Sequence, residues 1–147
     1  MSISFNECKT AHREMWLWLA ENPIKRKSDW PKFETGIYIF LTTYVGVNIP
    51  HNCFACYWVT NFNRRNCILC PITWVDETQK VIIDGCAGCE TKGTLYYKWK
   101  EFSSDLRYMR SGEFTTKKAK ELEIQASSFA TKLADIVWVN RTNKPQF

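Results

Sequence analysis

The sequence predicts an α+β protein in which a small zinc-stabilised module is flanked by N- and C-terminal helices. Six of the seven cysteines form C-x-x-C pairs, and the segments before and after them repeat apolar residues at helical spacing. Between these parts lies a run of β-branched and aromatic residues, which is typical of a strand. With 147 residues, the chain is long enough for one domain with its own core. We therefore expect a single domain, residues 1–147, with a helix at 4–21, a Cys-rich zinc module at 50–90 and helices at 94–136.

The first predicted element is the helix at residues 4–21. Ser4 and Glu7 have the spacing of a capping box, and Pro23 marks the end of the helix. Because Cys8 and His12 lie on the apolar face of this helix, we expect a buried core thiol and a structural imidazole. The apolar face comprises Phe5, Cys8, His12, Met15, Trp16 and Leu19.

The middle of the chain indicates its secondary structure less clearly. Residues 22–35 look like a polar connection around Trp30-Pro31. Residues 36–47 favour a strand, with a short buried helix as the alternative. Within the Cys-rich module we expect only short strands and turns, and residues 81–83 would form one edge strand.

Two helices are predicted after the Cys-rich module. Residues 94–110 repeat large apolar side chains at helical intervals until Ser111-Gly112 ends the pattern. Residues 115–136 give the clearest helix, because an apolar stripe runs along their whole length. The stripe comprises Ala119, Leu122, Ala126, Phe129, Ala130, Leu133 and Ile136.

Four cysteines have the spacing of a structural zinc site. Structural zinc takes four ligands in a tetrahedron, and thiolates are usual among them. A C-x-x-C turn brings two sulfur atoms together, so two turns complete the shell. A closed shell leaves no position for water and holds the fold without catalysing a reaction. The predicted ligands of one zinc ion are Cys53, Cys56, Cys67 and Cys70; the alternative is reduced cysteines packed in a core.

The third pair, Cys86 and Cys89, has several interpretations. Together with His51 it can bind a second ion, or it can replace one of the earlier pairs as ligands. Free thiols are a further alternative. A redox pair is the last, although no βαβ pattern surrounds the motif.

The charge of the chain is mildly basic and unevenly placed. The net charge is +5, and between residues 91 and 120 eight basic residues face three acidic ones. Such clusters suit phosphate backbones or an acidic protein partner, and they also occur on ordinary solvated surfaces. Aromatic residues interleave with the basic ones, as in many binding surfaces. The predicted binding surface comprises Arg64, Arg65, Lys98, Lys100, Arg107, Arg110, Lys117 and Lys118.

Catalysis and membrane insertion have no signal in the sequence. The chain has only two histidines and no motif of a hydrolase, phosphate loop or zinc protease. No apolar stretch is long enough to span a bilayer, and the N-terminus has no signal-peptide pattern. We therefore expect a non-enzymatic protein of the cytoplasm, in which the cysteines are thiols or metal ligands.

Several short motifs resemble a known group of proteins. They are Trp16-Leu17-Trp18-Leu19, Asn52-Cys53-Phe54-Ala55-Cys56, Cys67-x-x-Cys70-Pro71-Ile72-x-Trp74 and Gly93-Thr94-Leu95-Tyr96-x-x-Trp99. The series is similar to small Cys-rich proteins that tailed bacteriophages of Gram-positive hosts encode, whose functions are generally unassigned. The resemblance implies a phage origin, expression in the cytoplasm of a bacterial host and a metal-bound cysteine cluster.

The resemblance suggests a class of function by analogy. Phage accessory proteins of this size often bind and inhibit host machinery, including CRISPR and other defences. We therefore expect a zinc-stabilised, non-enzymatic accessory protein that binds and inhibits a host protein or ribonucleoprotein complex, such as an anti-CRISPR or other anti-defence protein. The alternative is a zinc protein that binds nucleic acid directly.

Overall fold

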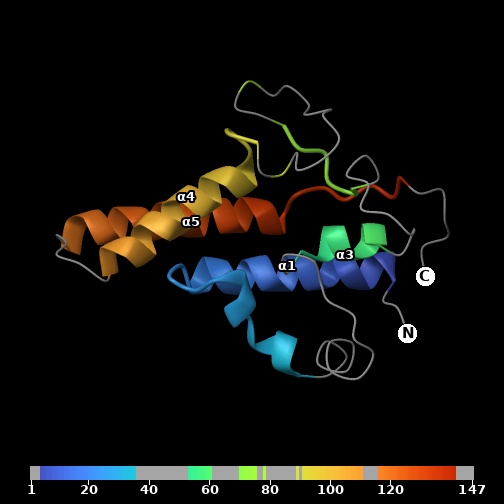
Figure 1. Ribbon diagram of the computed structural model, residues 1–147, viewed down its shortest axis with the longest axis horizontal. Helices are drawn as coiled ribbons and strands as arrows, with labels where there is room; N and C mark the ends of the chain where they lie inside the picture. The colour runs from blue at the N-terminus through green and yellow to red at the C-terminus, as the bar shows by residue number, and fades with distance from the viewer. Residues whose placement is uncertain are drawn as a thin grey trace.

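The computed structural model describes residues 4–35, 53–60, 70–75, 78, 89, 91–110 and 116–141. These residues form four α-helices and two short 3-10 turns (Figure 1). Within these ranges there is no strand, and the pairing between Ile72 and Trp138 is an isolated antiparallel bridge. The predicted α+β class is therefore wrong, and the described part of the chain is helical.

The first helix, α1 (Phe5–Glu21), begins and packs as its sequence predicts. Ser4 is the N-cap: its hydroxyl accepts the Glu7 amide hydrogen at 3.1 Å, and the Glu7 carboxylate accepts the Ser4 amide hydrogen. Cys8 is fully buried, and burial raises the pKa of its thiol. His12 is buried on the same face, so both expectations for this helix are confirmed.

Two long helices complete the helical part of the fold. Helix α4 (Leu95–Arg110) and helix α5 (Thr116–Ala134) pack against each other, and α5 also packs along α1 (Figure 1). Four members of the predicted stripe on α5, Leu122, Ala126, Ala130 and Leu133, are buried. The small alanine side chains let the neighbouring backbones approach closely. We refer to α1, α4 and α5 together as the helical frame.

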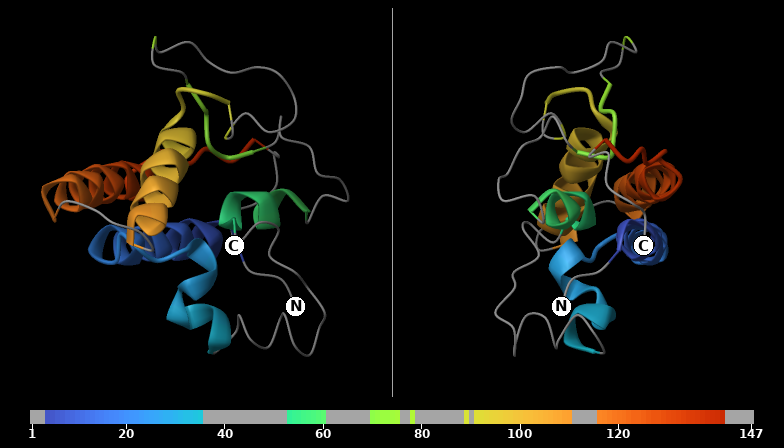
Figure 2. Two further views of the ribbon diagram at one scale, coloured as in Figure 1. Left: turned by 60° about the vertical axis from the view of Figure 1, so that its left-hand side comes forward. Right: turned by 90° about the vertical axis from the view of Figure 1, so that its right-hand side faces the viewer.

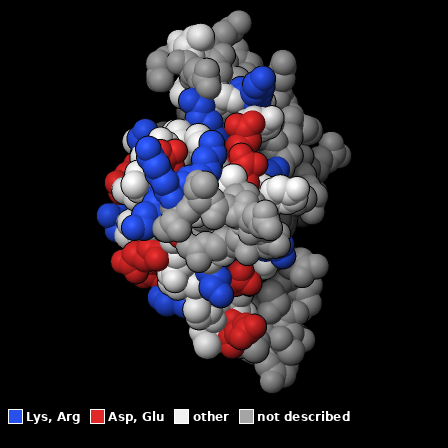
Figure 3. All heavy atoms as spheres, turned by 90° about the vertical axis from the view of Figure 1, so that its left-hand side faces the viewer, with Lys and Arg blue, Asp and Glu red and all other residues white. Residues whose placement is uncertain are grey.

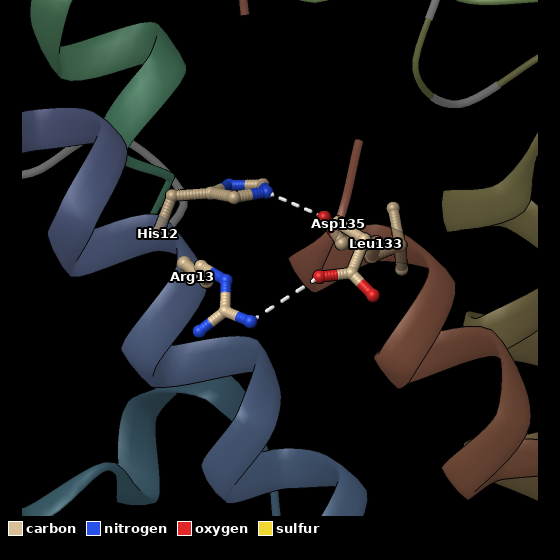
Figure 4. Close-up of polar contacts among 4 residues, drawn as sticks. All are labelled: His12, Arg13, Leu133 and Asp135. Carbon is tan, nitrogen blue, oxygen red and sulfur yellow. Dashed lines mark hydrogen bonds and ion pairs between the residues drawn. The ribbon is translucent and has the colours of Figure 1, made fainter. Parts of the chain in front are cut away.

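Two polar contacts join α1 to the end of α5 (Figure 4). The His12 ring nitrogen Nε2 lies 2.8 Å from the Leu133 carbonyl oxygen. Arg13 and Asp135 form an exposed ion pair at 3.5 Å. Beyond α5 the chain runs back beside residues 70–75, where the Val139 amide donates to the Pro71 carbonyl at 2.8 Å.

The Cys-rich part departs most clearly from prediction. Residues Phe54–Thr60 form a helix, α3, which lies beside α1 (Figure 2). Phe54, Tyr57 and Trp58 are buried, and their spacing places them on one face of a helix. The predicted short strands and turns are therefore wrong here, because aromatic packing against α1 favours a helix. The predicted strands at 36–47 and 81–83 lie outside the described residues.

The connection after α1 contains the two 3-10 turns, Lys27–Asp29 and Pro31–Glu34. Trp30 separates them and is buried against the ring of Phe54, with ring centroids 5.7 Å apart. This predicted polar connection therefore has an apolar anchor. It holds Arg26 and Lys27 at a fixed place beside the helical frame.

Candidate functional site

Cys53 and Cys56 lie at the start of α3. Cys53 immediately precedes the helix, and its sulfur accepts the Cys56 amide hydrogen at an N–S distance of 3.4 Å. The C-x-x-C motif therefore folds back on itself, as it must if both sulfur atoms are to face the same ligand. Both residues are partly exposed.

The electrostatics of these thiols link them to two other cysteines. A hydrogen bond from the Cys56 side chain is the largest cause that lowers the pKa of Cys53 to about 6, and Lys27 acts in the same direction against the effect of burial. The same hydrogen bond, followed by burial, raises the pKa of Cys56. Cys70 and Cys89 raise it further through their charges. Cys56 therefore lies within electrostatic range of three thiols from three segments of the chain.

Hydrogen bonds hold the two distant members of this group. The Cys70 carbonyl accepts a hydrogen bond from Arg141 Nη1 at 3.1 Å. The Cys89 carbonyl accepts one from the Thr94 hydroxyl at 2.7 Å. Thr94 is fully buried, and its oxygen also accepts the Tyr97 amide hydrogen at 3.2 Å, which caps α4. We call Cys53, Cys56, Cys70 and Cys89 the thiol centre.

The thiol centre overlaps only partly with the ligands predicted from the sequence. Cys53, Cys56 and Cys70 belong to both sets, whereas Cys67, Cys86 and His51 lie outside the described residues. Across the described ranges, which include the whole thiol centre, no three His, Cys, Asp or Glu side chains lie together so that they could hold a metal ion.

A second candidate site surrounds Tyr96 at the start of α4. Lys27 Nζ lies 4.5 Å from the centre of the Tyr96 ring, and Lys100 Nζ lies 5.5 Å from it. Tyr96 is partly exposed and stacks on Trp99, with ring centroids 6.1 Å apart and the ring planes 16° apart. Two lysines from separate segments therefore meet over one aromatic ring, an arrangement stabilised by the ring's negative face.

Arg107 extends this positive surface along α4, and Arg26 approaches it from the connection after α1. Arg107 Nη1 donates a hydrogen bond to Ser103 at 2.5 Å. Residues 96, 100, 103 and 107 follow one side of the helix, because they are three or four positions apart. Burial, and then the charge of Arg26, lower the pKa of Arg107, while Asp29 opposes this effect. We call Arg26, Lys27, Tyr96, Lys100 and Arg107 the Tyr96 surface.

The other predicted binding residues lie apart from the Tyr96 surface. Lys98 contacts the Phe129 ring on α5, with its Nζ 5.7 Å from the ring centre. Lys117 and Lys118 are exposed in the first turn of α5, and Arg110 ends α4. The end of the molecule where these two helices meet carries basic side chains interspersed with acidic ones (Figure 3). Arg64 and Arg65 lie outside the described residues.

Sequence reasoning found part of the Tyr96 surface and missed the rest. Lys100 and Arg107 were predicted binding residues, and the Lys25-Arg26-Lys27 run is conspicuous in the sequence. The periodicity of the sequence does not reveal that this basic run lies against α4. Its position depends on the burial of Trp30.

Comparisons with known proteins found no matching family model, no matching curated protein and no matching solved structure. Among the described residues, no helix is both long and apolar enough to cross a membrane.

Proposed function

We propose that this protein is a non-enzymatic binding protein that docks an acidic surface of a host protein complex onto the Tyr96 surface and thereby inhibits that complex. The observation that carries the proposal is the convergence of cations from two separate segments around one aromatic ring. Arg26 and Lys27 come from the connection after α1, whereas Lys100 and Arg107 come from α4.

The charges of this surface favour an anionic partner. Lys27 and Lys100 share one ring, and Arg107 is close enough to Arg26 for their charges to interact. Like charges held close together repel, and a docked carboxylate or phosphate relieves the repulsion. A partly exposed tyrosine beside arginines and lysines also supplies the contact area that dominates many protein interfaces.

The ring contacts favour a protein partner over direct stacking of nucleic-acid bases. Base stacking needs a free aromatic face. The Tyr96 ring already has Lys27 and Lys100 over it and Trp99 stacked against it. Direct nucleic-acid binding is the alternative function, since phosphates are attracted to the same cations.

The resemblance of the sequence motifs to those of phage Cys-rich proteins supports a bacterial host complex as the class of target. Such a protein would act in the host cytoplasm against a defence system such as a CRISPR nuclease. Inhibition by occupying an acidic surface of the target complex requires binding alone.

A pair of charge-reversal variants tests this proposal. Arg26→Glu combined with Lys100→Glu reverses two exposed members of the Tyr96 surface. Lys117→Glu combined with Lys118→Glu makes the same change in net charge on exposed residues of α5. We expect the unaltered chain and the α5 variant to retain one host complex in affinity purification and to inhibit its activity, and the Tyr96-surface variant to lose both.

Nucleic-acid binding is measured on the same three proteins. Retention of DNA or RNA that weakens steeply with salt, without a retained host protein, would favour the alternative function. Equal retention of the host complex by the Tyr96-surface variant would contradict the proposed docking surface.

A further inference from the structure

Cys53 and Cys56 lie on one closed turn of helix. The Cys53 carbonyl accepts the Tyr57 amide hydrogen at an N–O distance of 2.9 Å, and the Cys53 sulfur accepts the Cys56 amide hydrogen at 3.4 Å. Residues three apart on such a turn have Cα atoms about 5 Å apart, and a disulfide joins Cα atoms that are roughly 4.4–6.8 Å apart. A disulfide can therefore join this pair without a large movement of the backbone.

Aromatic packing fixes the turn that carries the two cysteines. Phe54 is wholly buried, and its ring centroid lies 5.7 Å from that of Trp30 and 5.8 Å from that of Phe33. Farther along α3, Trp58 packs edge-on against Phe5 of α1, with ring centroids 5.4 Å apart. Because these ring contacts involve no sulfur atom, the cysteine pair can change its covalent state while α3 stays in place.

The two sulfur atoms have different roles in thiol–disulfide exchange. The attacking group is an accessible thiolate. Cys53 is partly exposed, and its sulfur accepts a hydrogen bond from a backbone amide, which stabilises negative charge on that sulfur. Cys56 is also partly exposed and lies on the same turn, where it can attack Cys53 in a second step. Cys53 is therefore the attacking cysteine and Cys56 the resolving one.

We propose that Cys53 and Cys56 form a reversible disulfide by exchange with a low-molecular-weight disulfide. The Cys53 thiolate attacks one sulfur of that molecule, forms a mixed disulfide and releases a small thiolate, which takes up a proton. Cys56 gives its proton to water, attacks the Cys53 sulfur and releases the second small thiolate. The protein dithiol loses two electrons and two protons, and the small disulfide gains them. In a reducing compartment such a bond is transient and responds to oxidising conditions.

This reaction is independent of the proposed docking surface and can fail separately from it. The reduced full chain is incubated with excess glutathione disulfide, quenched with acid and mapped by mass spectrometry. We expect a disulfide between Cys53 and Cys56 that dithiothreitol reverses, with unchanged circular dichroism. In Cys56→Ser, glutathione should stay attached to Cys53. In the matched variant Cys8→Ser, which removes a fully buried thiol, the disulfide should form as in the unaltered chain.

Two results of this experiment would overturn the proposal. The first is a native chain in which no disulfide joins Cys53 to Cys56. The second is a disulfide between Cys53 and a cysteine of another segment.

A second measurement needs no variant. The reduced, native chain is treated briefly with N-ethylmaleimide, and the modified cysteines are identified by mass spectrometry. We expect Cys53 to react before the buried Cys8, and both Cys53 and Cys56 to be unreactive after treatment with glutathione disulfide. A reduced chain in which Cys53 reacts only after a chelator is added, or no faster than Cys8, would contradict the proposal.

Discussion

The helical frame and the thiol centre are stabilised in different ways. The frame buries regular apolar faces, in which Leu106 and Leu133 are wholly removed from solvent. The thiol centre gathers four partly exposed cysteines from three segments, and its long-range support consists of hydrogen bonds to carbonyl groups. Burial of apolar surface contributes far more to stability than a few hydrogen bonds at partly exposed groups. The thiol centre should therefore open locally more readily than the helical frame.

The largest expected effect is a cavity in the frame. Leu133→Ala removes a fully buried side chain from α5 and should lower the free energy of unfolding by about 2–5 kcal/mol. Urea denaturation measures it.

The matched control for this variant is Ile124→Ala on the same helix, where the side chain is 66% exposed. Its effect should stay within about 0.5 kcal/mol. Equal losses for the two variants would show that α5 is not packed as described.

The next effect is a dependence of stability on pH that arises from His12. Burial, with a smaller contribution from Lys27, lowers the pKa of His12 from 6.5 to about 4, against the opposing effect of the Leu133 carbonyl. Between these two pKa values the unfolded chain binds the proton and the folded chain does not, so stability falls as pH falls from 6.5 to 4. The free energy of unfolding therefore differs by about 3 kcal/mol between the two ends of this pH range, and the folded chain has its full stability above pH 6.5.

His12→Gln isolates this effect. Glutamine keeps an N–H donor for the Leu133 carbonyl and cannot titrate. Urea denaturation at a series of pH values should show a shallower loss for His12→Gln than for the unaltered chain. Identical pH profiles would mean that His12 is protonated as readily in the folded chain as in the unfolded chain.

A smaller loss of stability is expected at Thr94, where the helical frame meets the thiol centre. Thr94→Val removes the hydroxyl that caps α4 and holds the Cys89 carbonyl. The lost cap should cost about 1 kcal/mol of stability. Urea denaturation measures this loss.

The control for this prediction is Thr91→Val, which changes an exposed side chain three residues earlier. It should change stability by less than about 0.5 kcal/mol. A Thr94→Val variant with full stability would show that the Thr94 hydroxyl does not stabilise the start of α4.

The smallest effect concerns the exposed ion pair between α1 and the end of α5. In Arg13 and Asp135 the side chains are 57% and 61% exposed. Arg13→Ala should therefore change stability by less than about 0.5 kcal/mol, because water and salt screen such pairs. A larger loss in urea denaturation would show that Arg13 has a packing role.

The sequence predicted the frame well because its signals are local. The capping box of Ser4 and Glu7, the apolar face of α1 and the stripe of α5 all follow from spacing along one helix. It failed at α3, where the cysteines suggested turns and outweighed the helical spacing of Phe54, Tyr57 and Trp58.

The candidate sites were predictable only in part, because they depend on contacts between distant segments. The C-x-x-C motif marked Cys53 and Cys56 as a pair, yet nothing in the spacing says that the charge of Cys89 acts on Cys56. In the same way, Lys27 and Lys100 were visible as basic residues, whereas their meeting over Tyr96 requires the fold.

Hydrogen exchange of the full chain, followed by mass spectrometry, tests the contrast between the two regions most directly. We predict slow exchange where α4 packs on α5 and where α5 packs on α1, and faster exchange in peptides that cover residues 70–75 and 91–94. Equal protection of the two regions, or slower exchange in residues 70–75 than in the frame, would contradict the account.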